Sequence, residues 1–143
     1  MTWRELGIGR WDVLFAFAGR HYDDIEEVTE ILEEWDATPY ILQRVERIMS
    51  DDRMDTGFTF TVPEERLALV VTGPSSSGAE FIDTFVHEVH HLAVAIAKGL
   101  GYDLDSEGPA YLAGDAARAF ADVVCQLGCD RCHPSDFVSF ETD

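Results

Sequence analysis

Residues 84–92 read Thr-Phe-Val-His-Glu-Val-His-His-Leu, and the pattern His-Glu-x-x-His runs from His87 to His91. Side chains four residues apart on a helix lie one above the other, so these two imidazoles can reach one metal ion. Glu88 projects beside them, where its carboxylate can accept a proton from metal-bound water. His90 is interpreted as a neighbour beside the cleft, because His91 already completes the pattern. The segment therefore predicts a metal site on one side of a helix.

The flanking residues predict the helix that this site needs. Ser77 and Glu80 form a capping box, with Ser77 as the N-cap. Gly99 and Gly101 are typical stop signals at the other end. The apolar face is offset from the edge that carries His87, so one side of the helix can pack while another faces a cleft. Its residues recur at helical spacing and are Phe81, Phe85, Val89, Leu92 and Ile96.

Two histidines do not complete a catalytic zinc site, which usually has three protein ligands and a water molecule. Asp103, Asp105 and Glu107 are the carboxylates that follow within reach. We favour Glu107, because it opens a helix whose small residues can press against the histidine helix. Interaction of this carboxylate with the dipole of its own helix is the alternative.

Tyr111 lies four residues after Glu107 and therefore on the same face of that helix. Its hydroxyl can stabilise the oxyanion that forms when water attacks a carbonyl. It can equally orient Glu107, or it can be a packing tyrosine with a solvated hydroxyl. All three interpretations stay open at this stage.

The rest of the chain predicts one α+β domain over residues 1–143, with about three strands packed against about four helices. A buried strand is expected over residues 11–18, and two amphipathic helices should follow, the second beginning at Thr38 and Pro39. A hairpin over residues 57–71 leads into the histidine helix. We expect its second strand, residues 67–71, to form an edge of the cleft. A last long helix is expected from Glu107 to about Leu127.

The chain has 28 acidic and 10 basic residues, which gives a net charge of −18. This charge repels nucleic acids and weakly favours basic peptides as substrates. A protein that mimics nucleic acid is a less favoured interpretation. The first residues lack the layout of a secretory signal, and no apolar run is long enough to cross a membrane, so we expect a cytoplasmic protein.

Three cysteines and a histidine lie close together near the end of the chain. Reduced cysteines are the favoured interpretation, because four ligands within nine residues make a tight structural zinc site. Haem and iron–sulfur binding are disfavoured, since nothing else in the sequence supports them. The residues concerned are Cys125, Cys129, Cys132 and His133.

The segment from Thr84 to His91, followed by Glu107, resembles the gluzincin branch of the zinc metallopeptidases. Residues 57–115 are also similar to small zincin-like proteins encoded by bacteriophages and mobile elements of gut bacteria. In those proteins a hairpin precedes His-Glu-x-x-His, and a helix with Glu-x-x-Ala-Tyr-Leu-x-Gly-Asp follows. The resemblance implies that zinc is held by His87, His91 and Glu107, with Glu88 as the general base.

We therefore expect a zinc-dependent hydrolase, most simply a peptidase. We expect no sizeable second domain to wall the cleft, in contrast to larger gluzincins. A catalytically weak, zinc-stabilised interaction protein is accordingly the main alternative.

Overall fold

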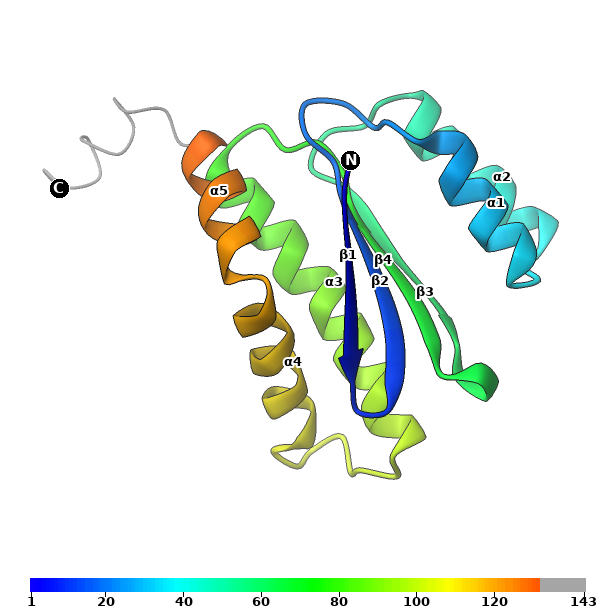
Figure 1. The fold of residues 1–143 in the computed structure, drawn as a ribbon, viewed down its shortest axis with the longest axis vertical. Coiled ribbons are helices and arrows are strands. Elements are labelled where there is room, and N and C mark those ends of the chain that lie inside the picture. The colour runs from blue at the N-terminus through cyan, green and yellow to red at the C-terminus, as the bar shows by residue number, and fades with distance from the viewer. Residues whose placement is uncertain (132–143) are drawn as a thin grey trace, which may run out of the picture.

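The structure is a computed structural model that describes residues 1–131. A mixed sheet of four strands lies at its centre, in the order β1-β2-β4-β3. The central strands β2 and β4 are parallel, while β1 pairs with β2 and β3 pairs with β4 in antiparallel fashion (Figure 1). The strands are β1 (Thr2–Ile8), β2 (Trp11–Phe17), β3 (Gly57–Val62) and β4 (Leu67–Thr72).

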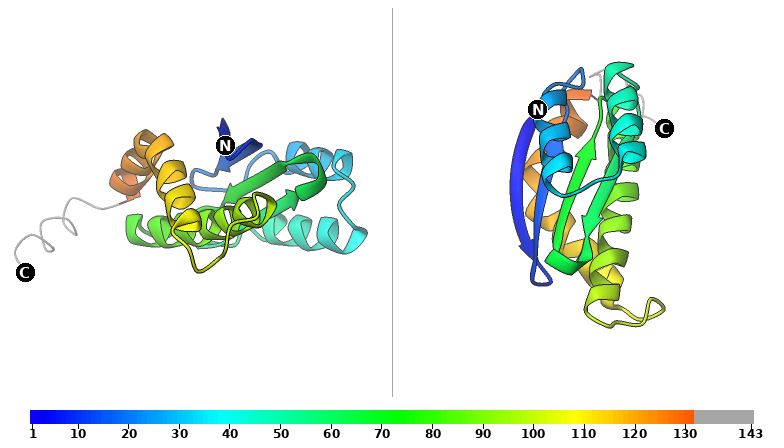
Figure 2. Two further views of the ribbon diagram at one scale, coloured as in Figure 1. Left: turned by 90° about the horizontal axis from the view of Figure 1, so that it is seen from below. Right: turned by 90° about the vertical axis from the view of Figure 1, so that its right-hand side faces the viewer.

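Within residues 1–131, five α-helices cover the two faces of this sheet (Figures 1 and 2). The first two helices lie on one face and the other three on the opposite face. A short 3-10 helix, Pro63–Glu65, connects β3 to β4. The α-helices are α1 (Ile25–Glu34), α2 (Pro39–Ser50), α3 (Gly78–Gly99), α4 (Gly108–Ala119) and α5 (Ala121–Arg131).

The central strands are apolar on both sides because both of their faces are covered by helices. Phe15 and Phe17 of β2 point into the core beneath α3, α4 and α5, where they contact Phe120. The alternate residues Ala16 and Ala18 belong to the second core, which α1 and α2 cover. Strand alternation thus divides one continuous apolar run between two cores.

The predicted helix starts are confirmed where a side chain caps them. Thr38 Oγ1 accepts a hydrogen bond from Ile41 N at 3.3 Å, and α2 begins at Pro39. Ser77 Oγ accepts one from Glu80 N at 3.1 Å at the start of α3. Each bond satisfies a backbone N–H that has no partner within its helix.

Three sequence expectations about the architecture are wrong. The sheet has a fourth strand, β1. The residues of β1 are partly exposed, and its backbone pairs with that of β2. The expected last helix is two helices that meet at Phe120, whose ring turns into the core. The edge of the sheet beside the histidine helix is β3, because β4 has a neighbour on each side.

The solvent-facing side of α1 carries the acidic residues Glu26, Glu27, Glu30, Glu33 and Glu34, all of which are exposed.

In the part of the chain that the structure describes, no helix is both long enough and apolar enough to cross a membrane.

Candidate functional site

The helix α3 brings His87 and His91 together on its exposed side, as the sequence predicts. Their Nε2 atoms lie 3.2 Å apart, and the two rings are nearly perpendicular, at 80°. The imidazole of His87 is 66% exposed, so a ligand can approach the pair from solvent. His90 also points outward, but its ring lies 6.1 Å from that of His91.

The distance between the histidines fits one shared metal ion. Two nitrogens bound to a tetrahedral zinc at about 2.0–2.1 Å are separated by about 3.3 Å. The observed 3.2 Å between His87 Nε2 and His91 Nε2 agrees with this value. The same distance also fits a hydrogen bond between the two rings. The interpretation as a metal site therefore also depends on the carboxylate that lies beside the two histidines.

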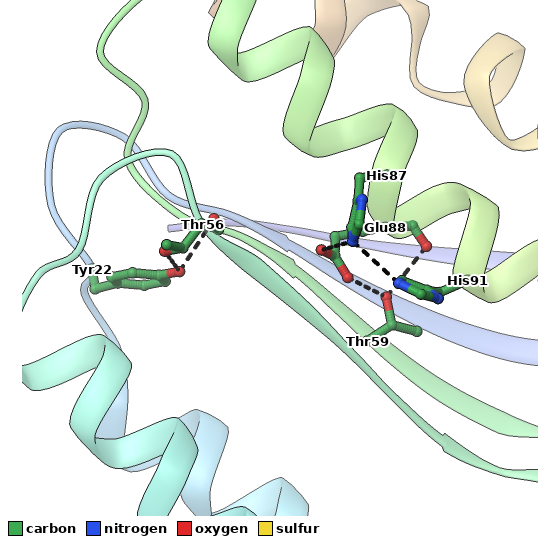
Figure 3. A network of polar contacts seen from close by, with 6 residues as sticks. All are labelled: Tyr22, Thr56, Thr59, His87, Glu88 and His91. Atoms are coloured by element: carbon green, nitrogen blue, oxygen red, sulfur yellow. Dashed lines mark hydrogen bonds and ion pairs between the residues drawn. The ribbon is translucent and has the colours of Figure 1, made fainter.

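Glu88 supplies that carboxylate from inside the protein. It is only 5% exposed, and its Oε2 lies 4.0 Å from His87 Nε2. The other oxygen, Oε1, accepts a hydrogen bond from Thr59 Oγ1 at 2.9 Å (Figure 3). The same hydroxyl lies 3.3 Å from the backbone oxygen of Glu88. Thr59 therefore fixes one oxygen and leaves the other facing the histidines.

A glycine lets β3 approach α3 closely enough for this contact. A Cβ atom on Gly57 would lie 2.6 Å from the backbone oxygen of Val71, and 3.0 Å from side-chain atoms of both Glu88 and Thr84. The first distance is too short for any real Cβ contact. Glycine at position 57 is thus required by the backbone of the neighbouring strand β4, and it also leaves room for the side chains of Glu88 and Thr84 on α3.

A buried tyrosine lies behind the site. The hydroxyl of Tyr22 lies 2.9 Å from Thr56 Oγ1, just before β3 begins (Figure 3). Burial raises the pKa of Tyr22 to about 12; the hydrogen bond from Thr56 opposes this shift, and the charge of Glu88 adds to it. The phenol is therefore protonated at neutral pH and acts as a structural support.

The histidine pair opens into a groove of about 920 Å³ between α2, β3 and α3. Such a volume is in the range of ligand-binding clefts. Its walls are largely apolar, with Ile41 and Ile48 on α2, Phe58 and Phe60 on β3, and Val94 on α3.

Glu107, which immediately precedes α4, and Tyr111 on α4 do not line this groove. Glu107 is exposed immediately before α4, and its side chain makes no capping hydrogen bond. The next residue, Gly108, lies against the ring of Tyr102, which follows the C-terminal end of α3. Tyr111 is 69% exposed. The structure therefore brings together His87, Glu88 and His91, but neither Glu107 nor Tyr111 lines their groove.

Among the side chains that the structure describes, those of residues 1–128, no group of three or more from His, Cys, Asp or Glu is arranged to hold a metal. The ligand role of Glu107 stays a prediction. Cys125 is a free, exposed cysteine on α5. Cys132 and His133, and the side chain of Cys129, lie outside the described residues, so the predicted state of the cysteine cluster also stays a prediction.

Sequence reasoning did not identify Thr59 or Gly57 as site residues. The alternation of threonine with phenylalanine over residues 57–62 is the signal that was available, because it places the small and polar side chains on one face of β3. Which helix meets that face is decided by the tertiary structure.

Comparisons of the chain with family models, with curated proteins and with solved structures found no match.

Proposed function

We propose that the protein is a zinc-dependent hydrolase that cleaves peptide bonds. The observation that carries this proposal is the 3.2 Å separation of His87 Nε2 and His91 Nε2, with Glu88 Oε2 beside them. Two imidazoles at the spacing of zinc-bound nitrogens, next to a buried carboxylate, supply two of the three ligands and the general base that hydrolysis at a zinc ion uses.

A zinc ion bound here would polarise a carbonyl group and lower the pKa of a water molecule. Glu88 would accept a proton from the attacking water and pass it to the leaving amine as the carbon–nitrogen bond breaks. Thr59 holds Glu88 by Oε1, so that Oε2 performs both transfers without rotation of the side chain.

The groove supplies a place for an extended peptide. The outer edge of β3 has no neighbouring strand among residues 1–131, so its outward backbone groups are free to pair with a peptide strand. This edge lies along the same groove as the histidines. A peptide bound there would have its backbone beside His87 and His91.

The family resemblance adds Glu107 as third ligand, and the helical spacing after Glu107 makes Tyr111 a candidate donor to the oxyanion. In the structure Glu107 immediately precedes α4, Tyr111 lies on α4, and neither residue lines the groove. Both assignments therefore rest on the sequence pattern, and a zinc titration of the Glu107 variant tests the ligand role of Glu107 directly.

A zinc-stabilised interaction protein is the second candidate. It is favoured by one observation, namely that no third ligand stands beside His87 and His91 in the part of the chain that is described. In this alternative the groove binds a partner peptide without cleaving it.

Substitution of Glu88 by glutamine separates these two candidates. Glutamine has nearly the same shape, but it cannot accept a proton at neutral pH. Zinc content should stay at the parent level, and cleavage of a broad peptide library should fall by about 10²- to 10⁴-fold, as for loss of a general base. Cleavage that survives the substitution would assign the base to another group. A parent protein that holds zinc and cleaves nothing would support the interaction protein.

A further inference from the structure

The groove beside β3 is lined by positive side chains, although the whole chain has a net charge of −18. Arg44 reaches it from α2 and Lys98 from α3, and both side chains are exposed. Among the described residues that line the groove, Glu88 is the single acidic one, and its carboxylate is buried against Thr59. The groove thus differs in charge from the surface around it.

Neither cation has an acidic partner among the side chains that the structure describes, those of residues 1–128. By contrast, Arg4 pairs with Asp122 at 2.6 Å and Arg118 with Asp115 at 2.9 Å. Unpaired Lys and Arg side chains are common in the described part of the chain, where ion pairs hold only Arg4, Arg53 and Arg118. What distinguishes Arg44 and Lys98 is that both line one groove, whose single acidic side chain is buried. Two unpaired cations facing one groove indicate a negatively charged ligand.

The position of Lys98 along α3 relates this charge to the histidine pair. Lys98 lies seven residues after His91, which corresponds to two helical turns and about 10 Å. An extended peptide advances about 3.3 Å per residue. A side chain that reaches Lys98 therefore belongs to a residue about three positions from the carbonyl at His87 and His91.

Local charges decide what binds in such a groove. Charges further apart than the Debye length, about 8 Å at physiological ionic strength, are largely screened. The acidic residues of the exposed face of α1 line no part of the groove, whereas Arg44 and Lys98 would contact a bound peptide directly. The net charge of −18 slows the approach of acidic ligands, but contacts within the groove determine the affinity.

We propose that the groove selects an extended peptide with an aspartate or glutamate about three residues from the carbonyl at the histidine pair. Lys98 is the main specificity-determining residue, and Arg44, on the groove wall formed by α2, adds to the same preference. This inference rests on the proposed function, because the histidine pair defines where the carbonyl lies. It replaces the preference for basic peptides that the net charge alone suggests.

The test measures binding apart from cleavage, with zinc-loaded Glu88→Gln protein and short fluorescent peptides. One glutamate is moved along an alanine-rich peptide, and glutamine or lysine replaces it at each position. We expect fluorescence anisotropy to show about tenfold tighter binding for glutamate at one position, equivalent to about 1.4 kcal/mol. Equal affinities for the glutamate and glutamine peptides at every position would overturn the inference.

Lys98→Glu should abolish this preference or reverse it in favour of lysine, and Arg44→Glu should weaken it. Arg47→Glu is the matched control, because it changes the net charge equally from an exposed position on α2 that does not line the groove. If Lys98→Glu and Arg47→Glu changed the preference for glutamate peptides to the same extent, the preference would not come from a local contact with Lys98.

The same peptides separate this inference from the proposed function. If the parent cleaves peptides without any acidic preference, the specificity fails and the hydrolase stands. If glutamate peptides bind with the expected preference but the parent cleaves nothing, the hydrolase fails and the acidic ligand stands. A single-stranded oligonucleotide that competed with the glutamate peptide at equal concentration would overturn the peptide as the occupant.

Discussion

The two sides of α3 are built from different kinds of residue. The groove side carries His87, His91 and Lys98, which are exposed and polar. The opposite side carries Ala93 and Ala97, which are buried in the core cluster that also contains residues of α4. On an ideal helix these alanines lie about 120–160° around the axis from His91. The helix thus faces a groove on one side and close packing on the other.

This difference shows which functional positions a helix can fix by itself. The separation of His87 from His91 follows from helical geometry, and the structure reproduces it at a zinc-like distance. The relation of Glu107 to this pair depends on the connection after α3 and on the packing of α4. Small residues bring α4 against α3, but on the side away from the histidines.

The largest expected effect comes from removing either groove-side imidazole. His87→Ala or His91→Ala should abolish stoichiometric zinc binding, because each removes a direct ligand. Zinc content after dialysis, measured by atomic emission, checks this result. His90→Ala is the matched control and should keep the metal. Full zinc occupancy in the His87/His91 double variant would place the metal elsewhere, with the cysteine cluster as the next site to test.

Glu107→Ala tests whether the α4 side contributes to the metal at all. If Glu107 is the third ligand, zinc affinity should fall by at least the 10- to 100-fold that loss of a supporting residue costs. Titration against a competing chelator measures it. Asp103→Ala and Asp105→Ala are controls, because both side chains lie in the same exposed connection. A larger effect of Asp105→Ala would mean that the third ligand is misassigned.

Thr59→Val removes the hydrogen bond that holds Glu88 while preserving the shape of the side chain. We expect peptide cleavage to fall about tenfold, as for other residues that orient a functional group. Unfolding by urea should also show a loss of about 1–3 kcal/mol, because a buried acceptor loses its donor. Thr61→Val, two residues along β3, is the control, since Thr61 makes no side-chain hydrogen bond to the described residues. Equal rates of peptide cleavage for the two variants would show that Thr59 has no role in the site.

The smallest effect concerns the attachment of α2, the outer wall of the groove. Asp52 accepts hydrogen bonds from His21 Nδ1 at 2.5 Å and from Tyr22 N at 2.6 Å, and these bonds hold the pKa of its carboxyl below the usual value. A lowered pKa in the folded state stabilises the protein above the pKa of the unfolded chain. That stabilisation is lost as the pH falls through the folded value.

Asp52→Asn should therefore lower the melting temperature slightly at pH 7, and the difference should disappear as the pH falls through the lowered pKa of the Asp52 carboxyl. Thermal melts across this range measure it. Asp122 is the counterpart on the other side of α3, where Arg4 lowers the pKa of its carboxyl. Asp122→Asn should show the same pH dependence without changing peptide affinity in the groove. A loss of affinity shared equally by both variants would indicate general destabilisation.

Several elements of the fold followed from local signals in the chain. Thr38 and Ser77 cap their helices, and the turn after Val62 connects a hairpin, because these features depend on residues only a few positions apart. The strand β1 was not recognised, since its residues are partly exposed and lack a continuous apolar run. The break at Phe120 depends on a ring that packs against Phe15, which no local pattern in the helix reveals.

The sequence by itself determined the spacing of His87, Glu88 and His91, because 3.6 residues per turn place them on one side of a helix. Only the tertiary structure decided what surrounds them. The packing of β3 against α3 at Gly57 brought Thr59 to Glu88, and the position of α2 turned Arg44 towards the same groove as Lys98. These contacts join residues far apart in the chain, so they depend on how the layers pack, which local spacing does not encode.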